Sequence, residues 1–371
     1  MTNKSHIDKK KIFIYTPFLG FDIHHHTKDQ GGLAEGFGNL GCDTTLIIGK
    51  ICGIFYPPNY KVIETGNVDK GKEVKGNLRE FFFVIPLFLN SDYNLILMLN
   101  YNRLIPLIAF LLRIRSLFSR SRKRMILRLD WDGIVGGSLI YKLLYTLSIK
   151  IDAILFDKII TETPCSFQKI SKTLMHKKDK LALVPVGIRS KNQSYNIFKK
   201  KIILCVARYV RFKGIDVLLK AFNIVHTVEP DWKLKVIGRI DDELYFNELS
   251  GFVKEKNLAG YVDLVGDLDD DELELSYRES SIFTLLSYSE SFGLVRAEAS
   301  YYGLPIVTTD AGCGSTYGDK IVPYGDFKAA ADRILELIMN PNIRTETVIS
   351  QRKNIKTWDQ VAQMLLRLHK E

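Results

Sequence analysis

Short apolar runs alternate with longer helical patterns along the whole sequence, and this alternation constrains the fold more than any other feature. Alternating strand-length and helix-length segments are typical of βαβ units, in which neighbouring strands are parallel. The sequence therefore predicts an α/β protein. The strands expected in its first half are Lys11–Thr16, Thr44–Ile48, Asn94–Leu99, Arg124–Leu129, Ile159–Glu162 and Leu181–Pro185.

A polar stretch, residues 189–200 (RSKNQSYNIFKK), divides the sequence before a new strand at Lys201–Ala207. With 371 residues the chain has room for two domains. We expect one Rossmann-like domain over residues 1–190 and a second over residues 200–345. The further elements expected in the second are strands at Lys233–Ile237, Val262–Val265, Ile282–Leu286 and Pro305–Thr308, and helices at Ile215–Val228 and Leu294–Tyr302.

The last segment, residues 346–371, contains an amphipathic helix at Trp358–His369. We expect it to pack back on the N-terminal domain, with Val361, Leu365, Leu366 and Leu368 on its buried face. Two doubly wound sheets facing each other would leave a cleft at the carboxyl ends of their strands, where such folds bind ligands.

The net charge of +10 indicates an anionic partner, which could be nucleic acid, phospholipid headgroups or a phosphorylated substrate. No apolar stretch is long enough to predict a membrane span, and the polar start predicts no secretory signal. We therefore expect a cytoplasmic protein. The basic runs lack interleaved aromatic residues and nucleic-acid motifs, so a nucleic-acid partner is not expected.

The segment 286–299 (LSYSESFGLVRAEA) is the most informative part of the sequence. It predicts the end of a buried strand, a polar loop with Glu290, and a helix that begins after Gly293 and contains Glu298. Amides at such a helix start can bind anionic or hydroxyl-rich groups, and two carboxylates beside them can accept hydrogen bonds from sugar hydroxyls. The structural alternative is a capping box that includes Glu290.

Two cations, Arg208 and Lys213, follow the first strand of the second domain. Placed at a strand-to-helix turn, they suit a diphosphate, and they would stabilise the charge that a leaving diphosphate gains. A solvated basic loop, expected for Arg211, is the alternative. In the first domain, Gly31 and Gly32 follow strand one and precede a helix, where the main chain can approach a phosphate closely. A plain turn is the alternative there.

These segments resemble glycosyltransferase family four (group 1). The resemblance is carried by Glu290-x7-Glu298 with Gly303-Leu-Pro305-Ile-Val307, and by Arg208 with the Lys213-Gly214 pair. It is supported by Val236-Ile-Gly238-Arg239, Val262–Gly266 and Thr357-Trp358-Asp359. The match covers most of residues 200–365 and is weaker over residues 1–190. It implies a GT-B fold of two facing Rossmann-like domains with parallel sheets, and sugar transfer with retention of anomeric configuration.

The resemblance also implies roles for individual residues. Glu298 would hold the donor ribose, Glu290 the transferred sugar, and the amides of Phe292–Leu294 sugar or phosphate oxygens. The backbone at Leu264–Val265 would lie near the nucleobase, and the glycine pair would face the donor phosphates. The donor-binding candidates are Gly31, Gly32, Arg208, Lys213, Gly238, Leu264, Val265, Glu290, Ser291, Phe292, Gly293, Leu294, Val295 and Glu298.

One position departs from the family, which often has a histidine beside the transferred sugar. This sequence reads Arg128-Leu-Asp130-Trp-Asp132-Gly there, so Asp130 takes that place, with Asp132 as the substitute. A carboxylate could orient an acceptor hydroxyl or stabilise positive charge on the sugar ring, or it could cap a helix. The candidate catalytic residues are Asp130, Glu290, Arg208 and Lys213.

Three features suggest other chemistry. Gly36-x-Gly38-x-x-Gly41 fits a dinucleotide fingerprint but runs into a strand instead of opening a helix, so we reject it. The adjacent His24, His25 and His26 lack metal-ligand spacing. The acidic run Asp267–Glu272 is interpreted as a helix start. The family resemblance implies no metal and no organic cofactor; the donor, a UDP- or GDP-linked sugar, is expected as a substrate.

The segment Leu104–Phe118 is strongly apolar and leads into Arg120, Arg122, Lys123 and Arg124. A core helix with a basic end is one interpretation. The other is a patch that enters an anionic membrane surface, with the protein peripheral on the cytoplasmic face.

The sequence as a whole predicts a hexosyltransferase-type enzyme that moves a sugar from a nucleotide diphosphate donor to a glycan or lipid-linked acceptor. The alternatives are a nucleotide-sugar epimerase or phosphorylase of the same fold, and a non-catalytic nucleotide-sugar binding protein.

Overall fold

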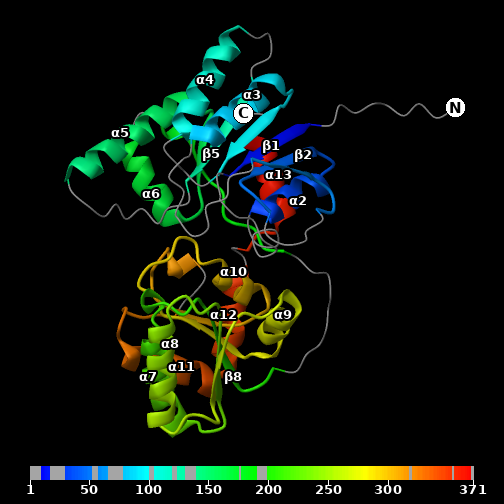
Figure 1. The fold of residues 1–371 in the computed structure, drawn as a ribbon. Coiled ribbons are helices and arrows are strands. Elements are labelled where there is room, and N and C mark those ends of the chain that lie inside the picture. The colour runs from blue at the N-terminus through cyan, green and yellow to red at the C-terminus, as the bar shows by residue number, and fades with distance from the viewer. Residues whose placement is uncertain are drawn as a thin grey trace, which may run out of the picture. The chain divides into compact units, whose positions relative to one another are not determined.

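The computed structural model describes residues 10–16, 30–51, 57–65, 78–99, 104–118, 123–129, 139–174, 177–189, 199–316, 320–352 and 355–368. The chain forms two compact units, Met1–Ser190 together with Lys356–Glu371, and Lys191–Ile355. Each unit contains one parallel sheet covered by helices (Figure 1). The α/β class that the alternating pattern predicts is confirmed.

The sheet of the first unit has the strand order β3-β2-β1-β4-β5-β6-β7. All of its strand pairs are parallel. Its strands are β1 (Lys11–Tyr15), β2 (Asp43–Ile48), β3 (Lys61–Glu64), β4 (Leu95–Met98), β5 (Arg124–Leu129), β6 (Lys158–Thr161) and β7 (Leu181–Leu183). The six strands predicted for this half are found within two residues of their expected bounds. The sequence did not predict β3, because this short edge strand has no buried residue to form an apolar run.

Helices cover the sheet of the first unit. They are α2 (Gln30–Asn39), α3 (Leu78–Asn90), α4 (Ile105–Leu117), α5 (Leu139–Leu155), α6 (Pro164–Thr173) and α13 (Trp358–Leu368), with the short 3-10 helix η1 (Lys178–Lys180). Alternate strand side chains such as Phe13 and Tyr15 form one core with buried residues of α3, α4, α5 and α6. The other helices, α2 and α13, contact each other (Figure 1).

The final helix, α13, buries Trp358, Val361, Ala362 and Leu365. These positions follow the spacing i, i+3, i+4 and i+7 that defines one helical face. Val361 and Leu365 were predicted for this face. Leu366 and Leu368 were also predicted there, but they flank it and are only half-buried.

Three glycines enclose the start of α13. A Cβ atom on Gly32 would lie 2.2 Å from Trp358 Nε1, and one on Gly36 would lie 2.6 Å from the Trp358 carbonyl oxygen. A Cβ on Gly187 would approach the same indole ring to 2.6 Å. Gly36, the first glycine of the rejected dinucleotide fingerprint, therefore allows α13 to pack closely against α2.

Replacing Gly32 with alanine is expected to lower the free energy of unfolding by about 1–3 kcal/mol, because the new methyl group overlaps the Trp358 ring. Gly251, in an exposed turn of α8, has nothing within 4 Å of its Cβ position and provides the control. Gly251→Ala should raise stability by about 0.5–1 kcal/mol. Thermal unfolding of both variants checks the difference, and equal stabilities would contradict it.

The second unit has the strand order β10-β9-β8-β11-β12-β13. All of its strand pairs are also parallel. Its strands are β8 (Ile202–Val206), β9 (Lys233–Ile237), β10 (Val262–Val265), β11 (Ile282–Leu285), β12 (Ile306–Thr308) and β13 (Lys320–Ile321). Among these strands, only β13, which is two residues long and lies at the edge of the sheet, was not predicted from the sequence.

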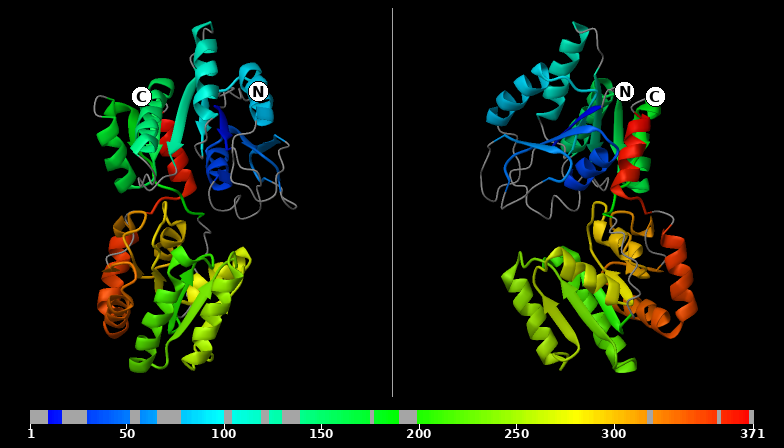
Figure 2. Two further views of the ribbon diagram at one scale, coloured as in Figure 1. Left: turned by 60° about the vertical axis from the view of Figure 1, so that its left-hand side comes forward. Right: turned by 90° about the vertical axis from the view of Figure 1, so that its right-hand side faces the viewer.

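Its helices are α7 (Ile215–Val228), α8 (Glu243–Glu255), α9 (Asp270–Glu279), α10 (Leu294–Tyr301), α11 (Phe327–Met339) and α12 (Pro341–Arg352), with the 3-10 helices η2 (Arg211–Lys213) and η3 (Gly314–Thr316). Figure 2 shows these helices around the sheet. The acidic run is a helix start, as predicted: the Asp269 carboxylate accepts hydrogen bonds from the amides of Asp271 and Glu272, and Glu272 completes a capping box.

Candidate functional site at one edge of the second sheet

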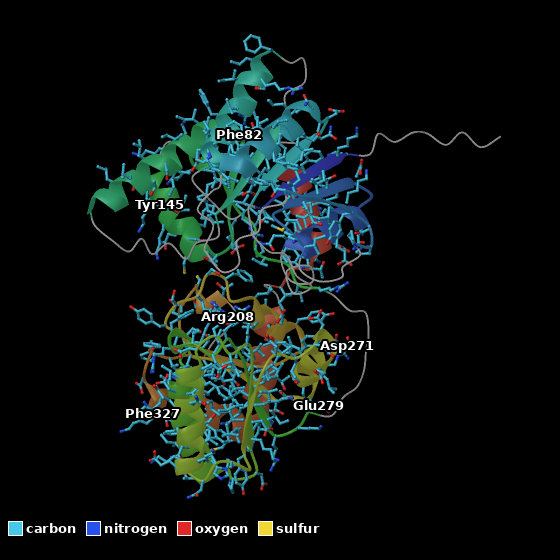
Figure 3. The ribbon with its side chains drawn as sticks, viewed as in Figure 1. Phe82, Tyr145, Arg208, Asp271, Glu279 and Phe327 are labelled. Atoms are coloured by element: carbon cyan, nitrogen blue, oxygen red, sulfur yellow. The ribbon has the colours of Figure 1, made fainter. Side chains whose placement is uncertain are left out.

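The predicted donor-binding residues of the second unit follow four neighbouring strands. Arg208 and Lys213 come after β8, Gly238 after β9, and Glu290 to Gly293 after β11, while Leu264 and Val265 end β10. Because these strands are parallel, their carboxyl ends meet at the same edge of the sheet. Figure 3 shows Arg208 at the end of the unit where α10 begins.

Lys213 and Glu290 form an ion pair, with 2.5 Å between Lys213 Nζ and Glu290 Oε1. Their side chains are only 13% and 8% exposed. Ser287 Oγ donates a second hydrogen bond, 2.9 Å long, to the same carboxylate oxygen. Glu290 is thus fixed by two groups and does not take part in a cap, so the capping-box alternative is wrong.

Gly214 places Lys213 at this edge. Its φ of 65° lies in the left-handed region, and a Cβ there would lie 2.2 Å from the Leu286 carbonyl oxygen. Only glycine fits such a position without a shift of the backbone. The turn after β8 therefore packs directly against the end of β11, which carries Glu290 on its following loop.

The loop after β11 leads into α10 through Gly293, the N-cap residue, which has a φ of 70° and no side-chain cap. The first amides of an α-helix have no partner within the helix. Those of Leu294 and Val295 are therefore oriented to bind an anion or hydroxyl, and the helix dipole favours negative charge there.

Glu298 lies one turn further along α10. Its carboxylate accepts a 2.8 Å hydrogen bond from the hydroxyl of Tyr277, a buried residue of α9. Burial, and then the neighbouring Glu298 charge, raise the pKa of Tyr277 well above its usual value, so the phenol remains a hydrogen-bond donor. Tyr277 thus fixes the position of the Glu298 carboxylate. The sequence predicted a role for Glu298 but not its contact with Tyr277.

Arg208 is held differently from Lys213. Its guanidinium donates a 2.7 Å hydrogen bond to Asp241, which also accepts one from Arg239 Nε at 2.5 Å. These bonds, that from Arg239 above all, hold the pKa of Asp241 below its usual value. Arg208 and Lys213 lie 5.9 and 5.4 Å from the centre of the Phe212 ring, so both cations flank one aromatic residue.

Gly238, Leu264 and Val265 lie at the neighbouring strand ends. A Cβ on Gly238 would lie 2.1 Å from the Ala207 carbonyl oxygen, which brings the turns after β8 and β9 together. The hydroxyl of the buried Tyr209 donates to the Val265 carbonyl oxygen at 3.0 Å. Leu264 and Val265 themselves stay half-buried at this edge.

Arg296 is a residue that sequence reasoning missed. Its side chain, on the first turn of α10, is fully buried. The guanidinium donates hydrogen bonds to the carbonyl oxygens of Phe292 and Ala311 at 2.8 Å and of Gly312 at 3.2 Å. It thereby joins the Glu290 loop to the loop after β12. An arginine in a helix is usually exposed, so the sequence carried no signal of this role.

In the first unit, Gly31 and Gly32 are buried in the first turn of α2 instead of preceding the helix. Asp130 and Asp132 lie outside the described residues, as do the three adjacent histidines and the two arginines at 120 and 122. Just before Asp130, the buried Arg128 pairs with Glu162, with 3.3 Å between Arg128 Nε and Glu162 Oε1.

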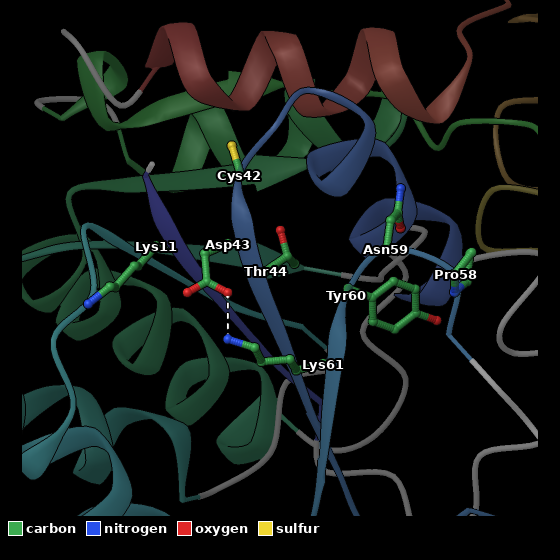
Figure 4. A pocket seen from close by; sticks show the side chains of 8 residues that line it. All are labelled: Lys11, Cys42, Asp43, Thr44, Pro58, Asn59, Tyr60 and Lys61. Carbon is green, nitrogen blue, oxygen red and sulfur yellow. Dashed lines mark hydrogen bonds and ion pairs between the residues drawn. The ribbon is translucent and has the colours of Figure 1, made fainter. Parts of the chain in front are cut away.

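A pocket of about 560 Å³ lies in the first unit where strands β1, β2 and β3 begin. This edge of the sheet is opposite to the carboxyl ends of these strands. An ion pair between Lys61 and Asp43 crosses the pocket (Figure 4). Its position at the amino ends of β1, β2 and β3 is not where doubly wound sheets bind ligands. Its lining residues are Lys11, Cys42, Asp43, Thr44, Pro58, Asn59, Tyr60 and Lys61.

Within the described part of the chain, no group of three histidine, cysteine, aspartate or glutamate side chains is placed to hold a metal ion. Among the same residues, every helix is too short or too polar to cross a membrane.

Residues 188–354 match the family model for glycosyl transferases group 1. An uncharacterized glycosyltransferase of Haemophilus influenzae is 31% identical over 43% of this chain and 43% of its own length. A phosphatidyl-myo-inositol mannosyltransferase of Mycobacterium leprae is 28% identical over 46% of each chain. The matched segment thus spans less than half the length of these relatives.

The whole chain is similar to solved structures as well. The pneumococcal O-GlcNAc transferase, solved in complex with UDP and GlcNAc, has a TM-score of 0.71 and 13% identity, and the match covers 98% of this chain and 99% of that one. At this identity the likeness shows the fold.

Proposed function

Residues 188–354 belong to the glycosyl transferases group 1 family, and from that premise we propose that this GT-B chain transfers a hexose, with retention, from a nucleotide diphosphate sugar to a glycan or lipid-linked acceptor. The observation that carries the proposal is the cluster of Lys213, Glu290 and the start of α10 at one edge of the second sheet. The UDP of the pneumococcal neighbour supports UDP as the nucleotide, with GDP as the alternative.

The reaction needs stabilisation of the leaving diphosphate more than it needs a protein base. As the bond between sugar and diphosphate breaks, negative charge accumulates on the phosphate oxygens. Lys213 and the amides of Leu294 and Val295 are suited to stabilise that charge, and Arg208 adds a second cation. A phosphate oxygen of the leaving group then accepts the proton of the attacking acceptor hydroxyl, on the face from which the diphosphate departs. Because attack and departure occur on the same face of the sugar, the anomeric configuration is retained. The proposed scheme needs no metal ion and no organic cofactor.

The two glutamates bind rather than react in this scheme. Glu290, fixed by Lys213 and Ser287, keeps its other carboxylate oxygen available for a hydroxyl of the transferred sugar. Glu298, fixed by Tyr277, accepts hydrogen bonds from the ribose hydroxyls. By its place in the family pattern, Asp130 is the residue that we propose to orient the acceptor hydroxyl.

A donor screen followed by product analysis tests this function. We expect one nucleotide sugar to raise the melting temperature, because a ligand that binds only the folded state stabilises it. Glu298→Gln should weaken this shift, since it replaces a charged acceptor of the ribose hydrogen bonds. With that donor and an acceptor mixture, the enzyme should release nucleoside diphosphate and form a glycoside of unchanged anomeric configuration, detected by NMR.

Three outcomes would contradict the proposal. Isomerised donor formed without acceptor would indicate an epimerase, and a sugar phosphate formed with inorganic phosphate would indicate a phosphorylase. Donor binding with no turnover in any acceptor mixture would indicate a binding protein.

A further inference from the structure

Helix α4 is apolar on its outer face as well as its inner one. It buries Ile105, Ile108, Ala109 and Leu112 against the core of the first unit. Its opposite face presents a second apolar stripe with helical spacing, ending in side chains that are 80% and 87% exposed. The members of that stripe are Leu107, Phe110, Ile114, Leu117 and Phe118. A helix that is apolar all round is usually buried on every side.

Helix α5 repeats the pattern. Its inner face buries Ile149, Asp152 and Ala153, and Phe156 is buried just after its end. Its outer face carries exposed apolar residues as well. Leu143, Leu147, Ile151 and Ile154 follow the helical spacing i, i+4, i+8 and i+11, and Leu144 lies next to the first of them.

Helices α4 and α5 pack against each other. Arg113 of α4 fixes them together: its Nε donates a 2.6 Å hydrogen bond to the Leu155 carbonyl oxygen, and its guanidinium pairs with Asp157 at 2.8 Å. Helix α3, which also contacts α4 (Figure 1), adds the exposed Phe82, labelled in Figure 3, and the exposed Phe83. Together the exposed residues of α3, α4 and α5 form what we call the outer apolar face.

The exposed charges on the described parts of these three helices have one sign, although Asp92, just after α3, is an exposed carboxylate. On the described parts of α3, α4 and α5 the acidic side chains are Glu80 and Asp152, and both are buried. The charged side chains exposed on these helices are cationic, namely Arg115 and Lys150. Two copies of such a face would bring like charges together, whereas an anionic lipid surface would attract them.

We propose that the outer apolar face inserts into the interfacial layer of an anionic phospholipid bilayer, with Arg115 and Lys150 contacting the lipid phosphates. Apolar side chains on a rigid helical layer gain free energy by leaving water, and the cations add electrostatic attraction. The face lies in the first unit, whereas the proposed donor site lies in the second. This inference does not depend on the transfer reaction, because lipid binding is measured without substrate.

Vesicle flotation tests the inference. The full chain should float with vesicles of phosphatidylcholine and phosphatidylglycerol and much less with phosphatidylcholine alone. The double variant Phe110→Ser/Leu117→Ser should lose about tenfold or more of this binding, because it removes two inserted side chains. Leu143→Ser/Leu147→Ser should reduce binding in the same way from the other helix. Leu244→Ser is the matched control, since Leu244 is 76% exposed on α8 of the second unit, and it should bind like the unchanged chain.

All variants alter exposed side chains, and unchanged circular dichroism and melting temperature would establish that they fold. Arg115→Glu/Lys150→Glu should abolish the preference for anionic vesicles. Flotation that is equal for the α4 variant and the Leu244 control would overturn the proposal. A stable dimer in sedimentation velocity that the α4 variant breaks, with no flotation of the unchanged chain, would assign the face to a second copy instead.

Discussion

Replacing Lys213 with alanine is expected to lower kcat for glycosyl transfer by a factor of about 10²–10³. Lys213 is a nearly buried cation, and at low exposure a charge interacts more strongly with a developing phosphate anion than it would in water. The donor binds with less charge on its bridging oxygen than the transition state carries. The loss should therefore fall mainly on kcat, with a smaller change in KM.

Lys220→Ala is the control for this prediction. Lys220 lies on α7, the helix that follows Lys213, and its exposed side chain pairs only loosely with Asp216 at 3.8 Å. Its removal should leave kcat unchanged. Lys213→Arg keeps the charge and should recover part of the activity. If Lys213→Ala changes KM for the donor but leaves kcat intact, Lys213 contributes to binding alone and the proposed stabilisation of the leaving group is wrong.

The apolar pattern predicted most of the fold because buried parallel strands leave a strong signal. Strands β5 and β9, which lie inside their sheets, have the bounds expected from their apolar runs. Strands β3 and β13 lack that signal, because each is a short edge strand without a fully buried residue. This is why β3 and β13 were found only in the structure.

The candidate site was predicted residue by residue but not as a network. The spacing of Glu290 and Glu298 identified two carboxylates, yet only the fold reveals that Lys213 and Tyr277 hold them. Contacts between distant segments leave no local pattern. The same limit applies to Gly32: its packing against Trp358, far away in the chain, left no local pattern, and its predicted place beside a donor phosphate stays a prediction.

Arg296 is the clearest case of a residue whose role depends on packing. A buried guanidinium requires hydrogen-bond acceptors, and three of those of Arg296 are carbonyl oxygens from two loops. These loops touch each other closely: a Cβ on Gly312 would lie 2.4 Å from the Ser291 carbonyl oxygen. Arg296 therefore holds the loop that carries Glu290 against the loop that follows β12, as a positioning residue.

Replacing Arg296 with leucine is expected to lower the free energy of unfolding by about 3–5 kcal/mol. Leucine is apolar and roughly fills the inner part of the space, but it leaves three buried carbonyl oxygens without these donors, at about 1–3 kcal/mol each. The unsupported loop should also misplace Glu290, so that kcat falls while the enzyme is still folded at low temperature. Urea unfolding followed by circular dichroism measures the first effect, and turnover well below the melting temperature measures the second.

Arg333→Leu distinguishes this role from the general loss of an arginine. Arg333 lies on α11 of the same unit, half exposed and paired with Glu336 at 2.9 Å. Its replacement should change stability by no more than about 0.5 kcal/mol. Arg296→Lys keeps a positive charge but offers fewer donors in a different geometry, so it should fall between leucine and the native residue in both stability and kcat. If Arg296→Leu is as stable and as active as Arg333→Leu, the carbonyl oxygens have found other donors, and Glu290 is held in place by Lys213 and Ser287 without Arg296.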